Sequence, residues 1–352
     1  MTTDIRFDQV GDWGVATLDN EKALNALNWD MVKAMYAQLQ TWAGDASVKA
    51  VLVKGEGERA FCAGGDIRWL YDNGKKDPEG TAEFFREEYT NNSLIYHYPK
   101  PYVALIDGIT MGGGVGISVH GDFRVAGDNT LFAMPETGIG LFPDVGGGHF
   151  MPRLHDGLGL YYALTGARAK AADCMAAGIA THYVAADKYD ELEHSLLKAS
   201  LGSHAHADVE TVLDIYAGDP GHAEINDKRG DIARLFQGRA TLNDLMQALE
   251  SDDSDIAESM LKTLSRMSPT SLRLTFEQMK RGHQLDFDDN MKMEFRMVRR
   301  VMAGHDFYEG VRAQIIDKDR DPKWSPATLA DVNDDVVAQY FEELGDTELL
   351  LP

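Results

Sequence analysis

The chain has 352 residues, of which 44% are hydrophobic and 26% charged, and its formal net charge at pH 7 is −23. This length exceeds a typical single domain and allows a large buried core. Because phosphate binding normally requires a basic surface, the negative charge argues against a nucleic-acid partner. No apolar run is long enough to cross a bilayer, so we expect a soluble protein without a membrane partner.

Targeting features and cysteines are both sparse. The first eight residues lack a basic segment followed by an apolar stretch, and they include acidic residues that transit peptides usually avoid. The two cysteines, Cys62 and Cys174, are too few for a disulfide framework and lack metal-ligand spacing. We therefore expect a reducing compartment and predict a cytoplasmic location.

The first half of the sequence alternates short β-branched runs with longer amphipathic segments, which is typical of α/β proteins. A helix is predicted over residues 28–42, with Asn28 as its cap and Met31, Met35, Leu39 and Trp42 on one buried stripe. Strands are predicted at residues 15–18, 50–54, 102–106, 123–126 and 131–133.

The second half of the sequence is predicted to be mainly helical. The clearest helical segments are residues 209–216, 241–250, 255–266 and 272–281. We therefore place a core in residues 1–195 and a mainly helical region that completes the fold in residues 196–352.

Several familiar catalytic motifs are missing. The sequence contains no P-loop and no dinucleotide-binding fingerprint in the correct strand-turn-helix register, and residues 116–120 lack the closing glycine of a nucleophile elbow. The histidines show no paired ligand spacing on a predicted helix. We therefore expect neither a metal ion nor a redox cofactor.

Three loops that follow predicted strands can carry chemistry. Two are glycine-rich, Phe61-Cys-Ala-Gly-Gly-Asp-Ile67 and Met111-Gly-Gly-Gly-Val-Gly116, and the third contains Pro135-Glu136. Glycine-rich backbone can direct N–H groups toward a negatively charged oxygen. Each loop alone is compatible with a tight turn, but together they indicate two hydrogen-bond donors and one carboxylate around a reacting carbonyl.

These three loops resemble the motifs of the enoyl-CoA hydratase/isomerase, or crotonase, superfamily. The resemblance implies a spiral of ββα units, an acyl-CoA substrate, and an oxyanion hole formed by the backbone N–H groups of Gly65 and Gly113. Residues 22–28 are similar to the stretch that contacts the adenine of coenzyme A. By this resemblance, Ala23, Ala63, Asp66 and Ile67 are also substrate-binding residues.

The sequence departs from the hydratase pattern at one position. Hydratases of this superfamily carry two glutamates, whereas this sequence has Gly116 at the first position and Glu136 at the second. Because the acid–base pair is incomplete, hydration is disfavoured, but one glutamate beside an oxyanion hole can still support thioester hydrolysis. Glu136 could attack the carbonyl to form a mixed anhydride or act as a base toward water, and the sequence leaves both routes open.

The longer match through residues 134–150 and 306–324 resembles hydrolases of this superfamily that act in valine breakdown, which implies 3-hydroxyisobutyryl-CoA as the substrate. By this resemblance, Asp144 binds the 3-hydroxyl group or assists proton transfer, and Glu88 is a further substrate contact. Acidic residues in loops rich in glycine and proline also commonly order turns or cap helices. That structural role is the alternative for Glu136 and Asp144, and a solvated position on an amphipathic helix is the alternative for Glu88.

Two other functions remain open. One is an enoyl-CoA hydratase or isomerase that uses Glu136 alone, against which Gly116 argues. The other is a catalytically inactive coenzyme A-binding or assembly module. A homo-oligomer is also compatible with the resemblance, because crotonase relatives often form trimers or hexamers.

Overall fold

The computed structural model describes residues 3–352, and these divide into two compact units, each assembled from three segments. The first unit contains residues 3–65, 90–133 and 168–227, and the second contains residues 66–89, 134–167 and 228–352. Two helices, α3 (Pro78–Tyr96) and α10 (Glu224–Phe236), continue from one unit into the other. The division between residues 195 and 196 stays a prediction.

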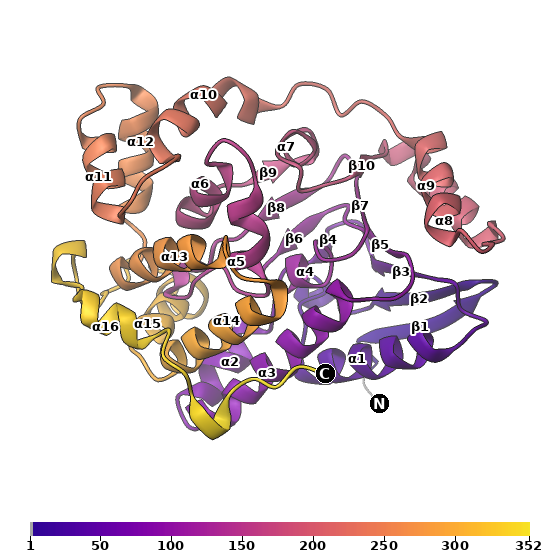
Figure 1. The fold of residues 1–352 in the computed structure, drawn as a ribbon, viewed down its shortest axis with the longest axis horizontal. Coiled ribbons are helices and arrows are strands. Elements are labelled where there is room, and N and C mark those ends of the chain that lie inside the picture. The colour runs from indigo at the N-terminus through magenta and orange to yellow at the C-terminus, as the bar shows by residue number, and fades with distance from the viewer. Residues whose placement is uncertain (1–2) are drawn as a thin grey trace. The chain divides into compact units, whose positions relative to one another are not determined.

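The first unit contains two sheets (Figure 1). The larger has the order β1-β2-β3-β5-β7-β10, and only the β1–β2 pair is antiparallel. Its strands are β1 (Ile5–Val10), β2 (Trp13–Leu18), β3 (Ala50–Gly55), β5 (Tyr102–Leu105), β7 (Phe123–Ala126) and β10 (His182–Tyr183). Strands β2 and β5 are buried at every residue, as expected for parallel strands covered on both faces.

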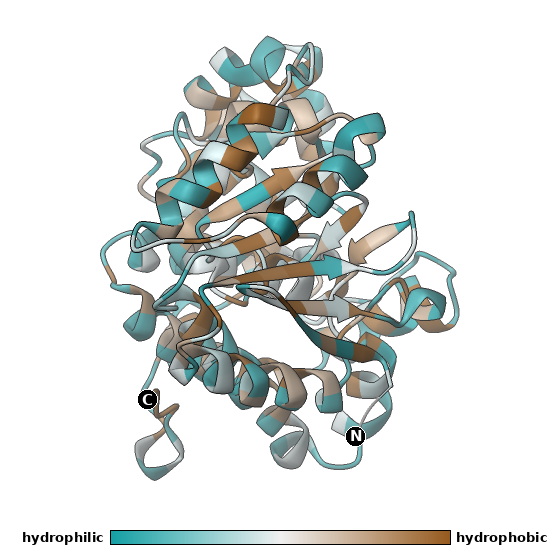
Figure 2. Ribbon diagram, turned by 90° about the vertical axis from the view of Figure 1, so that its right-hand side faces the viewer, coloured by the Kyte–Doolittle hydropathy of each residue, from teal (hydrophilic) through white to brown (hydrophobic). Residues whose placement is uncertain are grey.

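One face of the larger sheet packs against helices of the same unit. Alternate residues of β2, β3, β5 and β7 form a core with α8 (Ala186–Lys198) and α9 (Ala205–Tyr216). Leu192 and Leu196 from α8 and Leu213 from α9 are fully buried there. Figure 2 shows the hydrophobic residues in brown along these strands.

Helix α1 (Trp29–Gly44) confirms the predicted cap and stripe. The side chain of Asn28 accepts a hydrogen bond from the backbone N–H of Met31 at 2.9 Å. The predicted stripe, Met31, Met35, Leu39 and Trp42, is buried.

The smaller sheet has the order β4-β6-β8-β9 and includes the strands that precede the glycine-rich loops. Strand β6 (Ile109–Met111) lies parallel to both β4 (Ala60–Cys62) and β8 (Leu131–Ala133), and β9 (Ala169–Lys170) is antiparallel to β8. The carboxyl ends of the three parallel strands therefore lie on one edge of this sheet. The remaining short elements of the first unit are η1 (Glu21–Ala23), α4 (Gly113–Gly116) and α7 (Ala171–Ala177).

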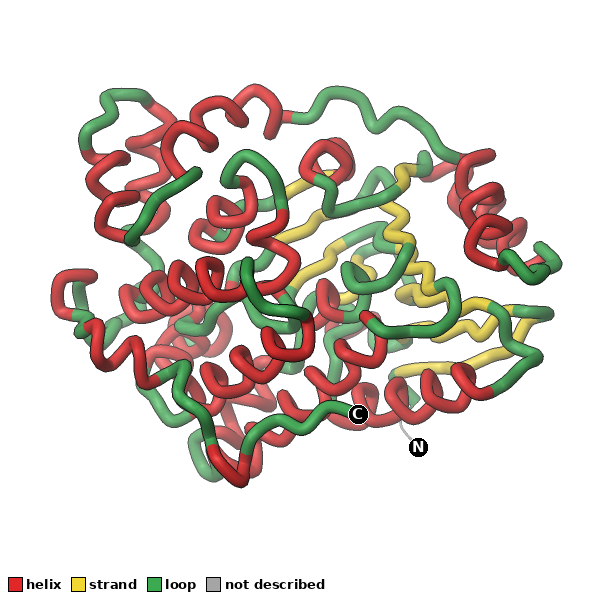
Figure 3. Tube along the Cα trace, viewed as in Figure 1, coloured by secondary structure: helices red, strands yellow, loops and turns green. Residues whose placement is uncertain are grey.

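The described residues of the second unit form helices and loops without a strand, and Figure 3 shows red helices joined by green loops. Its helices before residue 228 are α2 (Ile67–Gly74), η2 (Glu136–Ile139), α5 (Gly147–Phe150), η3 (Met151–Arg153) and α6 (Leu158–Thr165). Those after it are α11 (Leu242–Glu250), α12 (Asp255–Leu264), α13 (Pro269–Gly282), α14 (Phe287–Met302), α15 (Asp306–Val311), the π-helical η4 (Arg312–Ile316), η5 (Leu329–Asp331), α16 (Asp334–Gln339) and η6 (Gly345–Thr347).

The predicted α/β class and helical carboxy-terminal part are confirmed. Strand β10 ends at Tyr183, and residues 184–352 contain helices and loops only. Local caps fix several helix starts: Thr241 and Asp244 form a reciprocal capping box on α11, and Ser268 caps α13 ahead of Pro269. Among residues 3–352, no helix is both long and apolar enough to cross a membrane.

Candidate active site

In the first unit, Gly65 and Gly113 lie in two loops that leave the carboxyl ends of the parallel neighbours β4 and β6. Gly113 is the first residue of α4, where a helix has no internal acceptor for the N–H group. No hydrogen bond from the backbone N–H of Gly65 or Gly113 occurs among residues 3–352. Both N–H groups are therefore available to bind a ligand oxygen.

These loops require glycine at two positions. Gly64 has φ +115°, a conformation that side-chain-bearing residues rarely adopt, although a Cβ there would make only an ordinary contact, 3.8 Å from the Gly113 nitrogen. A Cβ on Gly114 would lie 2.2 Å from the carbonyl oxygen of Cys62, so α4 could not pack against β4. These glycines thus allow the two loops to lie side by side.

Ala23 and Ala63 lie in the same part of the first unit. The backbone N–H of Ala63 donates to the carbonyl oxygen of Leu24 at 3.0 Å, and Leu27 forms a parallel bridge with Gly65. Ala23, at the end of η1, is exposed, whereas Ala63 is half-buried. The structure therefore brings the stretch that follows Ala23 beside the loop that contains Ala63 and Gly65.

Asp66 and Ile67 begin the second unit at the start of α2. The Asp66 carboxylate accepts a hydrogen bond from the backbone N–H of Trp69 at 3.0 Å and caps this helix. Its observed partner is thus structural. Ile67, the first residue of α2, is half-buried.

The second unit contains a group of buried acidic side chains. Glu88, Glu136 and Asp144 have relative exposures of 3%, 5% and 4%. The hydroxyl of Tyr89 donates to Asp144 Oδ2 at 2.9 Å. Oε1 of Glu88 and Oε2 of Glu136 are buried without a hydrogen-bond partner among residues 3–352. Because buried polar atoms are normally paired, these two oxygens are candidates for contact with a ligand or water.

Burial disfavours the ionised forms of these three carboxyl groups. It raises the pKa of Asp144 to about 7, although the Tyr89 hydroxyl and the backbone N–H of Asp144 itself favour the carboxylate. The pKa of Glu136 lies well above its usual value because of burial and then the charge of Asp144. Burial and the charge of Asp144 also raise the pKa of Glu88. Perturbed carboxyl groups of this kind are typical of functional sites.

The structure can be compared with the alternative roles considered above, a solvated position for Glu88 and turn formation or helix capping for Glu136 and Asp144. Glu88 does not occupy a solvated position on α3, since it is almost completely buried. Glu136 is the first residue of η2, but no side chain caps that helix. The backbone carbonyl oxygen of Asp144 accepts from the Gly147 N–H at 2.8 Å, while its side chain is held by Tyr89.

Sequence reasoning missed Tyr89 and Glu294, two further residues of this group. Glu294 of α14 is completely buried and accepts hydrogen bonds from the backbone N–H groups of Gly146 and Gly148. The available signal was a glutamate between the apolar residues Met291 and Val298 on one face of the helix.

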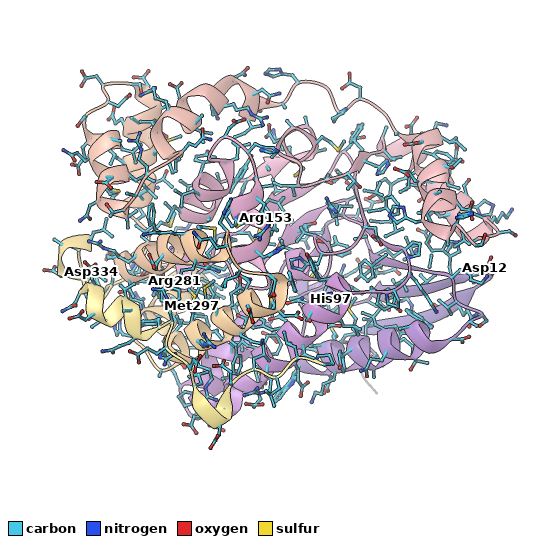
Figure 4. All side chains as sticks on the ribbon, viewed as in Figure 1. Asp12, His97, Arg153, Arg281, Met297 and Asp334 are labelled. Carbon is cyan, nitrogen blue, oxygen red and sulfur yellow. The ribbon has the colours of Figure 1, made fainter. Side chains whose placement is uncertain are left out.

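A cavity of the second unit, with a volume of about 640 Å³, is lined by Arg153, Arg239, Lys280 and His283 together with apolar residues such as Phe236. Arg153, labelled in Figure 4, already donates to several backbone carbonyl oxygens, those of His149, Gly282, His283 and Leu285. Its guanidinium therefore holds the end of α13.

Among residues 3–352, no three His, Cys, Asp or Glu side chains are grouped so that they could hold a metal ion.

The raised pKa of Asp144 predicts an effect on stability. Between pH 3.8, the usual pKa of an aspartate, and pH 7, about the pKa of Asp144 in the folded protein, the folded protein keeps a proton that the unfolded chain loses. Stability therefore falls as pH rises through this range. Asparagine avoids this cost. We expect Asp144→Asn to be more stable than the wild type at pH 8, by at most about 4 kcal/mol, and nearly equal at pH 4. Urea unfolding at both pH values measures this; an equal difference at both would contradict it.

Nearly the whole chain is similar to known proteins. A family model described as enoyl-CoA hydratase/isomerase matches residues 13–341. The chain is 48% identical to the mitochondrial 3-hydroxyisobutyryl-CoA hydrolase of Danio rerio, over 99% of this chain and 92% of that protein. It is 44% identical to the human protein of the same name, over 98% of this chain and 90% of that protein.

Solved structures share the fold. A carnitinyl-CoA dehydratase from Mycobacterium thermoresistibile has a TM-score of 0.91 at 38% identity, covering 99% of each chain. An enoyl-CoA hydratase from Rhodobacter sphaeroides has a TM-score of 0.89 at 36% identity, covering 99% of this chain and 100% of that chain. The predicted crotonase fold with a helical carboxy-terminal region is confirmed.

The predicted cytoplasmic location is wrong by the same comparison, because the curated relatives are named as mitochondrial enzymes. The prediction depended on the two cysteines and on the composition of the first residues. Few cysteines indicate a reducing compartment, but they do not separate one reducing compartment from another.

Proposed function

The chain belongs to the enoyl-CoA hydratase/isomerase family, and we propose that within this family it is an acyl-CoA thioester hydrolase. Its proposed reaction is the cleavage of 3-hydroxyisobutyryl-CoA to 3-hydroxyisobutyrate and coenzyme A, a step of valine breakdown. Full-length identity of 44–48% to curated hydrolases of this name is the observation that carries the proposal.

Hydrolysis fits the acidic residues better than hydration does. In the hydratase pattern a glutamate stands at the position of Gly116, which is buried in α4 and supplies no acid or base. Proton transfer by such a group contributes roughly 10²–10⁴-fold in rate. Without it, the addition of water to a double bond loses one of its two carboxylates, whereas attack on a thioester carbonyl requires only one.

We propose that the N–H groups of Gly65 and Gly113 bind the thioester oxygen and that Glu136 acts on the carbonyl carbon. Both N–H groups lack partners among residues 3–352, and both follow neighbouring parallel strands. Chain connectivity supports the participation of Glu136, because it follows the end of β8 by three residues and β8 is the other parallel neighbour of β6. Three residues span at most about 10 Å.

Glu136 has two chemical routes. As a nucleophile it would form a mixed anhydride with the acyl group and expel the coenzyme A thiolate; as a base it would take a proton from the attacking water. Burial makes the ionised carboxylate more basic, and its population grows with pH. Solvent oxygen-18 that enters Glu136 during a single turnover would support the anhydride route, whereas label confined to the released acid is expected both from direct attack by water and from attack of water on the acyl carbon of the anhydride.

The remaining predicted residues receive roles in substrate binding. We propose that Asp144 binds the 3-hydroxyl group or assists proton transfer, and that Glu88, whose Oε1 has no partner among residues 3–352, is a further polar contact. Ala23, Ala63 and Ile67 are proposed to contact the coenzyme A portion. Asp66 is proposed as a further substrate-binding residue, and its carboxylate also caps α2.

A second candidate function is enoyl-CoA hydration, because the two solved structures described above are named as a dehydratase and a hydratase. Comparing the two reactions on one enzyme preparation separates the candidates. We expect rapid thiol release from 3-hydroxyisobutyryl-CoA and little loss of the crotonyl-CoA double bond, followed by its ultraviolet absorbance. Rapid hydration without thiol release would favour the hydratase, and binding of coenzyme A without either reaction would favour an inactive module.

A further inference from the structure

Glu294 is a completely buried carboxyl group surrounded by hydrogen-bond donors; burial raises its pKa to about 8, whereas the bonds from Gly146, Asn290 and Gly148 favour the ionised form. Its Oε2 accepts the backbone N–H of Gly146 at 2.7 Å, and its Oε1 accepts the backbone N–H of Gly148 at 2.8 Å. Two side-chain amides, from Asn290 at 2.9 Å and Gln278 at 3.1 Å, also donate to Oε1. Four donors on one carboxylate fix its position closely.

The backbone held by Glu294 is the loop that carries Asp144. Val145 has φ +50° and Gly146 has φ +89°, and a left-handed conformation at a β-branched residue is strained unless its surroundings impose it. The Nε2 group of Gln278 also donates to the carbonyl oxygen of Pro143 at 2.7 Å. Residues on both sides of Asp144 are therefore tied to α13 and α14.

The packing leaves this loop little freedom to adjust. A Cβ on Gly148 would lie 2.5 Å from Oδ1 of Asn290, and a Cβ on Gly282 would lie 1.9 Å from the carbonyl oxygen of Gly148. Close packing of the loop against α13 and α14 means that the carboxylate of Glu294 meets the loop N–H groups directly, without an intervening water layer.

We propose that Glu294 is a positioning residue: by holding the Gly146 and Gly148 N–H groups, it fixes the loop so that Asp144 meets the Tyr89 hydroxyl in the orientation that catalysis requires. This inference rests on the proposed function, since it assigns Glu294 a role only through Asp144. Loss of the carboxylate leaves a buried N–H group unpaired and releases the strained backbone at Val145. A displacement of about 1 Å at a reacting group can lower a rate by about 10²-fold.

The test is a double-mutant cycle between Glu294→Gln and Asp144→Asn, read as kcat/KM for 3-hydroxyisobutyryl-CoA. We expect Glu294→Gln to lower kcat/KM by about 10²-fold in the wild-type background. In the Asp144→Asn background its effect should shrink to less than about threefold, because the group that it positions is already inactive. The matched control is Glu277→Gln, which removes a carboxylate of α13 that pairs with Arg281 at 2.7 Å; this control should retain wild-type activity.

Asn290→Ala provides a milder variant in case Glu294→Gln does not fold. It removes one donor to Glu294, keeps the carboxylate, and deletes an amide oxygen that has no partner among residues 3–352. We expect a smaller loss of kcat/KM that is likewise suppressed by Asp144→Asn. An equal loss in both backgrounds, or full activity of Glu294→Gln, would overturn the proposal.

A readout without substrate separates this inference from the proposed function. The ¹³Cγ resonance of Asp144 should titrate at a different pH in Asn290→Ala than in the wild type, and Glu277→Gln should leave the titration unchanged. An unchanged titration in Asn290→Ala would contradict the positioning role. If the titration moves but the wild type releases no thiol, the positioning of Asp144 stands and the proposed hydrolase function fails.

Discussion

Replacing Glu136 by glutamine is expected to lower kcat for thioester hydrolysis by roughly 10²–10⁴-fold, with little change in KM. The amide keeps the size of the side chain but can neither attack the carbonyl nor accept a proton from water. Burial and the charge of Asp144 raise the pKa of Glu136 well above its usual value. In the wild type, kcat should therefore rise with pH as the carboxylate forms, and this dependence should disappear in Glu136→Gln.

Steady-state thiol release and calorimetric binding of coenzyme A, measured together, test this expectation. Glu258→Gln is the matched control, because it removes the charge of an exposed glutamate on α12. A Glu136→Gln enzyme that kept more than about a tenth of the wild-type kcat would rule out a direct role for this carboxylate, whatever its effect on KM.

Replacing Gly113 by proline is expected to lower kcat by about 10²–10³-fold, the usual cost of one lost oxyanion donor. Proline removes the backbone N–H and is tolerated at the first position of a helix, which Gly113 occupies in α4. The loss should appear mainly in kcat, because the negative charge on the thioester oxygen develops in the transition state.

The control for this substitution is Gly113→Ala, which adds a Cβ but keeps the N–H group. The ratio of the two kcat values isolates the donor, provided that circular dichroism and coenzyme A binding show both variants to be folded. Equal losses in the two variants would mean that the added side-chain carbon, rather than the missing hydrogen bond, causes the defect.

Sequence patterns predicted the helices and strands that are determined by residues close together in the sequence. Helix α1 followed from an asparagine cap and an apolar stripe, and β2, β3 and β5 followed from β-branched runs that the structure buries. Strands β9 and β10 contain two residues each, too few to show a period, and their pairing depends on distant strands. They were not predicted for that reason.

The residues of the candidate site also fall into two groups, those that the sequence indicated and those that only the structure revealed. Glycine-rich loops after strands indicated two donor loops, and the family resemblance indicated the individual residues Gly65, Gly113, Glu136, Asp144 and Glu88. Glu294 and Tyr89 matter through contacts with residues 146, 148 and 144, far from them in the sequence, which no local pattern reports. The capping bond of Asp66 likewise required the structure.

The reaction of the wild-type enzyme with 3-hydroxyisobutyryl-CoA in oxygen-18 water, analysed by mass spectrometry after many turnovers, tests the hydrolase assignment most directly. We predict free coenzyme A and 3-hydroxyisobutyrate in equal amounts, with solvent oxygen in the carboxylate of the acid. Intact thioester with no released thiol, under conditions where the protein is folded and binds coenzyme A, would contradict the assignment.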